Sequence, residues 1–144
     1  MATQKNLDKT YMNMAIELSK LSYAKRKKVG CLIVKDTQII SEGFNGTPKG
    51  FPNQCETLSD SDELYTKREV LHAESNAISK IARSTTSSEG ATLYVTTAPC
   101  YDCSKLIIQA GIVRVVYKDL YRDHGLSLLE RAGVDITYYK SLGL

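Results

Sequence analysis

Apolar residues recur along this chain at two different spacings, which predict both helices and strands. Residues 10–21 carry apolar side chains at a rough helical spacing. These side chains are Tyr11, Met14, Ile16, Leu18 and Leu21. Two strand-like runs follow at 29–34 and 38–44, and the Asp36-Thr37 pair between them predicts a hairpin turn.

The second half of the chain alternates between helical and strand-like segments. Helices are expected over 72–83, 100–110 and 125–132, and strands over 91–96, 112–117 and 135–139. Strands separated by helices of this length are typical of parallel crossovers. The sequence therefore predicts an α/β fold with a five-stranded mixed sheet and helices on both faces. An antiparallel hairpin begins this sheet and parallel strands complete it.

Residues 45–70 show no regular spacing of apolar side chains and contain scattered Gly, Pro, Asp and Ser residues. A long stretch of this kind inside a compact domain is usually functional. We expect one short helix within it, near residues 62–68.

Composition and charge narrow the possible partners. The chain has 144 residues, which fits a single domain over 1–144, and its formal net charge is +3. This mild charge favours an anionic ligand only weakly, and no nucleic-acid partner is expected. The chain contains neither a membrane-spanning apolar run nor a signal peptide, so we expect a cytoplasmic protein without a membrane partner. In that compartment its four cysteines are expected to be metal ligands or free thiols.

Two cysteines and one histidine are spaced as ligands of a single metal ion. Cys100 and Cys103 share one face in the first turn of the predicted helix 100–110, where thiolates are favoured. Pro99 suits the start of that helix, because it has no N–H to leave unpaired. With His72 they form a Cys₂His set with one open position, as in catalytic zinc sites. Zn²⁺ lowers the pKa of a water there to about 7, which makes hydroxide available at neutral pH.

Glu74 gives this ligand set a catalytic interpretation. It lies two residues beyond His72, where its carboxylate can reach a metal-bound water and carry protons as general acid and base. The alternative role of Glu74 is that of a helix-capping acid, and Cys-x-x-Cys alone also fits a redox pair or half of a structural zinc site. A non-catalytic zinc-binding module is a further alternative, but it has no use for this carboxylate. His-x-Glu followed by Pro-Cys-x-x-Cys is the known signature of zinc deaminases.

Three segments carry a resemblance to a known family. Residues 72–78 and 96–103 resemble the zinc-binding motifs of the cytidine/deoxycytidylate deaminase family. The octet 43–50, Gly-Phe-Asn-Gly-Thr-Pro-Lys-Gly, is similar to a loop of the deoxycytidylate (dCMP) deaminases, although by itself it also fits plain turn chemistry. The likeness covers nearly the whole chain. It implies the cytidine-deaminase-like α/β/α sandwich and hydrolysis of dCMP to dUMP and ammonia, which feeds thymidylate synthesis.

The resemblance also implies roles for residues outside the metal set. Asn45 is implied as a contact to the substrate sugar, and Ala73 and Tyr121 as further substrate contacts. Arg26 and Arg122 are candidate ligands of the substrate phosphate, because Arg matches phosphate with two parallel hydrogen bonds. The alternative for each arginine is a solvated surface charge.

Assembly and regulation follow from the resemblance alone. Many family members are homohexamers activated by dCTP and inhibited by dTTP, which implies a homo-oligomer with an effector site at Asn45, Gly46 and Lys49. Mg²⁺ would accompany a nucleoside triphosphate effector. Some relatives bind a second, structural zinc through loop cysteines, for which Cys31 and Cys55 are the candidates here. Two further ligands are not evident, which favours buried thiols.

One rival function shares the zinc signature. tRNA adenosine deaminases usually carry Asp-Pro shortly before the His-Ala-Glu triplet, whereas residues 67–71 read Lys-Arg-Glu-Val-Leu. A tRNA-binding protein is also expected to carry a broader basic surface than a net charge of +3 indicates. A dCMP deaminase is therefore the first prediction, and a tRNA-editing deaminase is the alternative.

Overall fold

A mixed five-stranded sheet forms the centre of the computed structural model, which describes residues 2–144. Its strands are β1 (Gly30–Lys35), β2 (Gln38–Phe44), β5 (Thr92–Thr97), β6 (Arg114–Asp119) and β7 (Asp135–Tyr138). They lie in the order β2-β1-β5-β6-β7. β1 pairs antiparallel with β2 and β5, whereas β5, β6 and β7 are parallel. The predicted α/β class with a five-stranded mixed sheet is confirmed.

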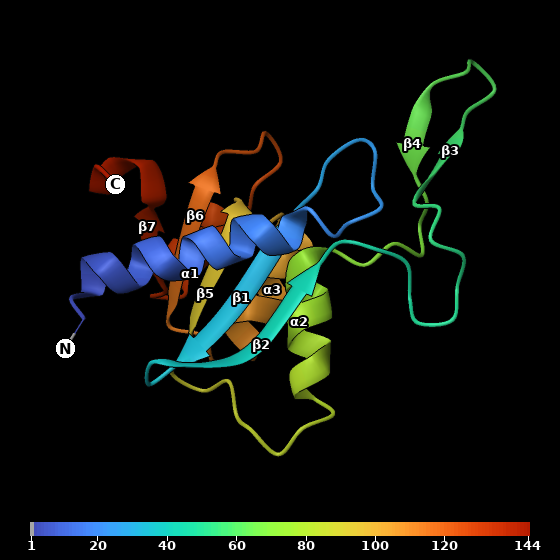
Figure 1. The fold of residues 1–144 in the computed structure, drawn as a ribbon. Helices are drawn as coiled ribbons and strands as arrows, with labels where there is room; N and C mark the ends of the chain where they lie inside the picture. The colour runs from blue at the N-terminus through green and yellow to red at the C-terminus, as the bar shows by residue number, and fades with distance from the viewer. Residues whose placement is uncertain (1) are drawn as a thin grey trace.

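Helices cover both faces of this sheet. α1 (Gln4–Ser19) crosses one face, and α2 (Ala73–Ile81), α3 (Tyr101–Gln109) and α4 (Leu126–Arg131) pack on the other (Figure 1). A 3₁₀ turn, η1 (Tyr139–Leu142), follows β7. The layers form the expected α/β/α sandwich. Within residues 2–144, no helix has the combination of length and apolarity that crossing a membrane would need.

Successive residues of the central strands face opposite helical layers, because side chains alternate along a strand. In β1, Cys31 and Ile33 belong to the core under α2 and α3, whereas Leu32 and Val34 belong to the core under α1. Tyr94 of β5 also faces α1. Because both faces are covered, β1 is apolar over consecutive positions rather than at every second one.

Gly43 allows α2 to lie directly on β2. A Cβ atom at this position would come within 2.6 Å of the Ala73 carbonyl oxygen and 2.8 Å of the Ala77 nitrogen. A larger residue would push α2 away from the sheet. Because α2 begins directly after His72, this close packing also sets the position of that histidine.

The first helix is longer at its start than the apolar stripe over 10–21 predicts. α1 begins at Gln4, where the Thr3 hydroxyl caps it by accepting a hydrogen bond from the Asn6 N–H at 3.2 Å, and it ends at Ser19. Its first turns are polar, and its buried Asp8 forms an ion pair. An apolar pattern therefore could not reveal this part of the helix.

The prediction of a short helix near residues 62–68 is wrong. This region forms an antiparallel hairpin of β3 (Glu56–Leu58) and β4 (Leu64–Thr66), which projects from the body of the molecule in Figure 1. At its tip the Ser59 hydroxyl accepts a hydrogen bond from the Glu63 N–H at 3.0 Å. Such local side-chain bonds give the backbone an alternative to a helix.

The two cysteines outside the predicted metal set are both buried. Cys31 is 0% and Cys55 is 1% exposed, as expected for buried thiols. Burial also raises the pKa of the Cys31 thiol well above its usual value. In the described part of the chain, the only cluster of three or more potential metal ligands is His72 with Cys100 and Cys103, so a second zinc site gains no support.

Candidate metal centre and catalytic site

The three predicted metal ligands meet at the starts of two helices. His72 is the N-cap residue of α2, Cys100 is the N-cap residue of α3, and Cys103 lies in the first turn of α3. The His72 Nδ1 atom lies 3.4 Å from the Cys100 Sγ and 3.3 Å from the Cys103 Sγ. All three ligand atoms lie within 4.8 Å of one another.

This donor set fits Zn²⁺. Ligands that lie about 2.0–2.3 Å from a tetrahedral zinc are themselves roughly 3.3–3.8 Å apart. The two distances from the His72 nitrogen to the cysteine sulfurs, 3.4 and 3.3 Å, agree with that spacing. Two thiolates and one imidazole leave the fourth position of the metal for water, as in catalytic zinc sites.

The electrostatics around Cys100 favour a thiolate. Hydrogen bonds from Cys103 and His72 lower the pKa of the Cys100 thiol to about 4. The contact with Cys100 in turn raises the pKa of His72. The pKa of Cys103 is raised by its hydrogen bond to Cys100 and by burial, so this thiol keeps its proton without a metal and would release it on binding one.

Glu74 lies in the first turn of α2 and is 4% exposed. Burial raises the pKa of its carboxyl group to about 7, while the positive charge of His72 opposes this rise. A bound Zn²⁺ would add a nearby positive charge, which favours the ionised carboxylate. The side chain lines the same cavity as His72 and Cys100, so it lies where a general acid and base is needed.

A cavity of about 310 Å³ opens over this centre. That volume lies within the roughly 300–1,000 Å³ of typical small-molecule sites. Its lining residues are Ala24, Arg26, Lys27, Val29, Asn45, Thr66, Val70, His72, Ala73, Glu74, Thr97, Ala98, Cys100 and Tyr121. The predicted substrate contacts Arg26, Asn45, Ala73 and Tyr121 are therefore brought together around the metal centre.

Other predicted residues lie outside this lining. Arg122 follows Tyr121 directly but is exposed and is not among the lining residues. Gly46 and Lys49, predicted as effector contacts, are not among them either. Gly46 nevertheless approaches the segment before the metal ligand, because it exchanges backbone hydrogen bonds of 3.1 and 2.7 Å with Leu71. Within the glycine-rich segment 43–50, Asn45 thus lines the cavity, whereas Gly46 and Lys49 do not.

Asn45 holds the loop that carries the basic lining residues. Its side-chain nitrogen donates to the Lys27 carbonyl at 2.8 Å, and its side-chain oxygen accepts from the Val29 N–H at 2.9 Å. The predicted contact to a substrate sugar is untested. The structure adds a second role for this amide, which is to fix the backbone on one side of the cavity.

Lys27 is a cavity residue that was not predicted from the sequence. Its Nζ atom lies 4.9 Å from the centre of the Tyr121 ring, which is within reach of a cation–π interaction. Both residues line the cavity, so this contact joins two segments across its wall. Residues 25–28 are all basic, and such a run of like residues does not reveal which side chain faces a site.

Comparisons with known proteins agree with this geometry. Residues 5–119 match the family model for the cytidine and deoxycytidylate deaminase zinc-binding region. Deoxycytidylate deaminase of Schizosaccharomyces pombe is 36% identical over 141 residues, which cover 92% of this chain but only 44% of the fungal protein. The enzyme of Enterobacteria phage T4 is 31% identical, with 88% of this chain and 86% of the phage protein covered.

A solved structure shows the same fold. The dCMP deaminase of cyanophage S-TIM5, crystallised with dCMP and dUMP, superposes with a TM-score of 0.88 at 40% sequence identity. The match covers 95% of this chain and 99% of the cyanophage chain. The chain therefore spans less than half of its fungal relative but nearly all of this viral one.

Proposed function

The chain belongs to the cytidine and deoxycytidylate deaminase family, and from this membership we propose that it hydrolyses dCMP to dUMP and ammonia. The proposal rests on one observation: a Cys₂His set and the buried carboxylate of Glu74 line a single cavity. The viral deaminases, matched over most of their length, support dCMP as the substrate.

The residues of the site divide the reaction between them. His72, Cys100 and Cys103 would hold the zinc ion, which supplies a water that is acidic enough to react at neutral pH. Glu74 would take one proton from this water as the water oxygen bonds to C4 of the cytosine ring, and would pass that proton to ring nitrogen N3. The same carboxyl group would then take the remaining proton from the new hydroxyl group on C4 and pass it to the amino group on C4. The C4–N bond then breaks, so one water is consumed and one ammonia is released.

Recognition of the monophosphate falls to the basic side of the cavity. Arg26 is exposed and lines the cavity, so its guanidinium is free to pair with a phosphate dianion. Lys27 adds a second positive charge on the same loop. Asn45, Ala73 and Tyr121 line the same cavity, and we assign the sugar and the base to these residues.

Further proposals rest on family membership. They are a single catalytic domain over 1–144, a homohexamer in the cytoplasm, and regulation by dCTP and dTTP with Mg²⁺ at the glycine-rich loop around Gly46. The approach of this loop to Leu71, next to His72, supports a route from an effector to the site.

A substrate panel tests the proposed function. The zinc-loaded protein is incubated with dCMP, CMP, deoxycytidine and dCTP, and loss of the cytosine chromophore is followed by ultraviolet absorbance. We expect the highest kcat/KM for dCMP. Deamination of adenosine in a tRNA anticodon stem-loop, with no activity on any of the four cytosine compounds, would instead establish the tRNA-editing alternative.

A further inference from the structure

Glu56 is a buried carboxylate that the proposed chemistry does not use. It lies on β3, and only 4% of its surface is exposed, whereas all three residues of β4 are exposed. Its Oε2 atom accepts hydrogen bonds from the Lys25 N–H at 2.7 Å and from the Arg26 N–H at 2.9 Å. Within residues 2–144, no basic side chain forms an ion pair with it. Its charge is therefore directed at two successive backbone groups.

A buried carboxylate is retained at a cost, because it gives up its hydration. Hydrogen bonds from N–H groups to a charged oxygen are short and strong, and they offset this cost only while the backbone keeps its position. The bonds from Glu56 therefore restrain the backbone at Lys25 and Arg26. A surface loop without such a partner would be free to move.

The restrained loop is the one that faces the proposed phosphate. Asn45 fixes its far end through Lys27 and Val29, and Glu56 fixes its near end. Arg26 is held a second time from the same hairpin, because its Nη1 atom donates to the Thr66 hydroxyl at 3.3 Å. The projecting hairpin thus contacts the Arg26 main chain from β3 and the Arg26 side chain from β4.

We propose that Glu56 is a positioning residue for monophosphate recognition: from β3 it fixes the backbone at Arg26 and so holds the Arg26 guanidinium at the cavity. This inference rests on the proposed function, since it assumes that Arg26 contacts the substrate phosphate. It assigns a task to the β3–β4 hairpin, whose strands are otherwise largely exposed.

The test compares two substrates that differ only in the phosphate. Glu56→Ala should lower the ratio of kcat/KM for dCMP to kcat/KM for deoxycytidine by about 10-fold, because small misplacements of a binding group are costly. The loss should be mainly a higher KM for dCMP. Glu56→Gln should keep more of the ratio, since its amide oxygen can still accept both N–H bonds. Binding of dUMP, measured by calorimetry against deoxyuridine, should weaken in parallel.

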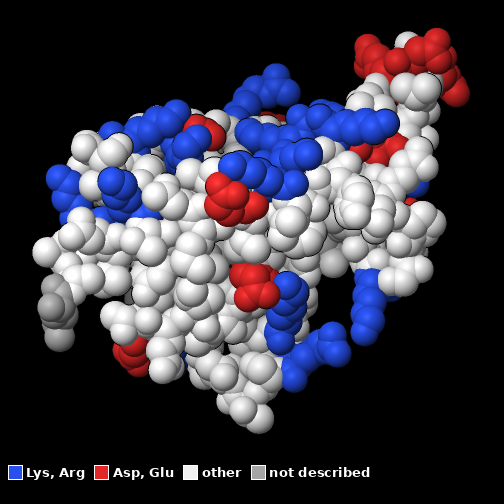
Figure 2. Space-filling view, in the orientation of Figure 1, with Lys and Arg blue, Asp and Glu red and all other residues white. Residues whose placement is uncertain are grey.

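A double variant separates positioning from general damage. If Glu56 acts through Arg26, adding Glu56→Ala to Arg26→Ala should cause no further fall in the ratio, because coupled residues are not additive. The matched control is Glu63→Gln in the turn of the same hairpin, whose acidic tip is red in Figure 2. This variant should keep the wild-type ratio.

Three outcomes would overturn the inference. Glu56→Ala could leave the ratio unchanged, both Glu56 variants could lose activity on dCMP and deoxycytidine equally, or the losses of Glu56→Ala and Arg26→Ala could add in full. Failure of the proposed function is visible separately. In that case the wild-type protein would not deaminate dCMP, before any variant is compared.

Discussion

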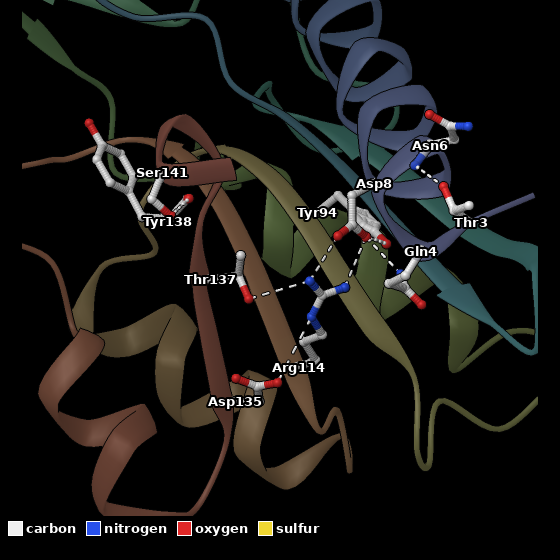
Figure 3. A network of polar contacts seen from close by, with 10 residues as sticks. All are labelled: Thr3, Gln4, Asn6, Asp8, Tyr94, Arg114, Asp135, Thr137, Tyr138 and Ser141. Atoms are coloured by element: carbon white, nitrogen blue, oxygen red, sulfur yellow. Dashed lines mark hydrogen bonds and ion pairs between the residues drawn. The ribbon is translucent and has the colours of Figure 1, made fainter. Parts of the chain in front are cut away.

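The carboxylate of Asp8 and the guanidinium of Arg114, 106 positions apart in the sequence, face each other through two parallel hydrogen bonds of 2.9 Å (Figure 3). Asp8 is 2% exposed, and the Tyr94 hydroxyl donates a third bond to it at 2.6 Å. The network joins α1 to β5 and β6. It lies on the face of the sheet opposite α2 and α3, so it stabilises the fold without touching the metal ligands.

We predict that Tyr94→Phe lowers the free energy of unfolding at neutral pH by about 1.5–3 kcal/mol, the usual contribution of a hydrogen bond to a charged group. Although burial alone would raise it, the bonds from Arg114 and Tyr94 lower the pKa of Asp8 below its usual value of 3.8. Such a group stabilises the fold above its unfolded-state pKa and loses that contribution as pH falls through its folded-state pKa. The cost of Tyr94→Phe should therefore shrink at pH values below 3.8.

Denaturant unfolding over a range of acidic pH measures this effect. The matched control is Tyr11→Phe, which removes a hydrogen bond of 3.2 Å to the neutral Thr37 carbonyl. The loss of unfolding free energy caused by Tyr11→Phe should not change as Asp8 is protonated. A Tyr94→Phe cost that stays constant from neutral to strongly acidic pH would contradict the assigned role of the Asp8 charge.

The metal ligands give the second prediction. Alanine at His72, Cys100 or Cys103 should reduce bound zinc far below one ion per chain, because each replacement removes one of only three protein ligands. Elemental analysis of the purified variants measures this directly. Cys55→Ala, which removes a buried thiol outside the cluster, should keep its zinc. Full zinc retention in all three ligand variants would refute the assignment.

Glu74→Gln separates proton transfer from metal binding. The amide has nearly the shape of the carboxyl group but cannot shuttle protons, so turnover should fall by about 10² to 10⁴ while zinc content stays unchanged. Steady-state kinetics measures the turnover, and elemental analysis of the same preparation measures the zinc content. Glu69→Gln, at an exposed position before the metal ligand, serves as the control. Near-normal turnover of Glu74→Gln would remove this residue from the mechanism.

The two arginines that are candidate phosphate ligands should differ in how much kcat/KM for dCMP falls when each is replaced by alanine. Arg26 lines the cavity and Arg122 does not, so Arg26→Ala should cost about 10- to 150-fold in kcat/KM for dCMP, as expected for a charged hydrogen bond. Arg122→Ala should cost much less. The ratio of activities on dCMP and deoxycytidine measures each loss. A larger effect at Arg122 would mean that the phosphate is bound by Arg122 rather than by Arg26.

Much of the fold could be predicted from local pattern. In β1 residues 31–34 form a continuous apolar run, and the helices between the parallel strands carry apolar residues at a helical spacing. The start of α1 and the β3–β4 hairpin could not be predicted in this way. Asp8 is buried only because Arg114 meets it from a distant strand, and three-residue strands such as β3 carry too few positions for a period to be seen.

The metal centre was predictable because its chemistry restricts residue type and spacing together. His72 and Glu74, followed by Cys100 and Cys103, form a pattern that few other sites share. No comparable sequence pattern indicates a role for Glu56. Its partners are backbone N–H groups, which every non-proline residue offers, so only the folded chain reveals the contact.

The most direct test of the account is zinc-dependent conversion of dCMP to dUMP by the purified protein. Zinc is removed with a chelator, the protein is dialysed, and dUMP and ammonia are measured before and after one equivalent of zinc is restored. We expect no turnover in the zinc-free protein, recovery with zinc, and equal amounts of dUMP and ammonia. A zinc-loaded, folded protein that leaves dCMP unchanged would contradict it.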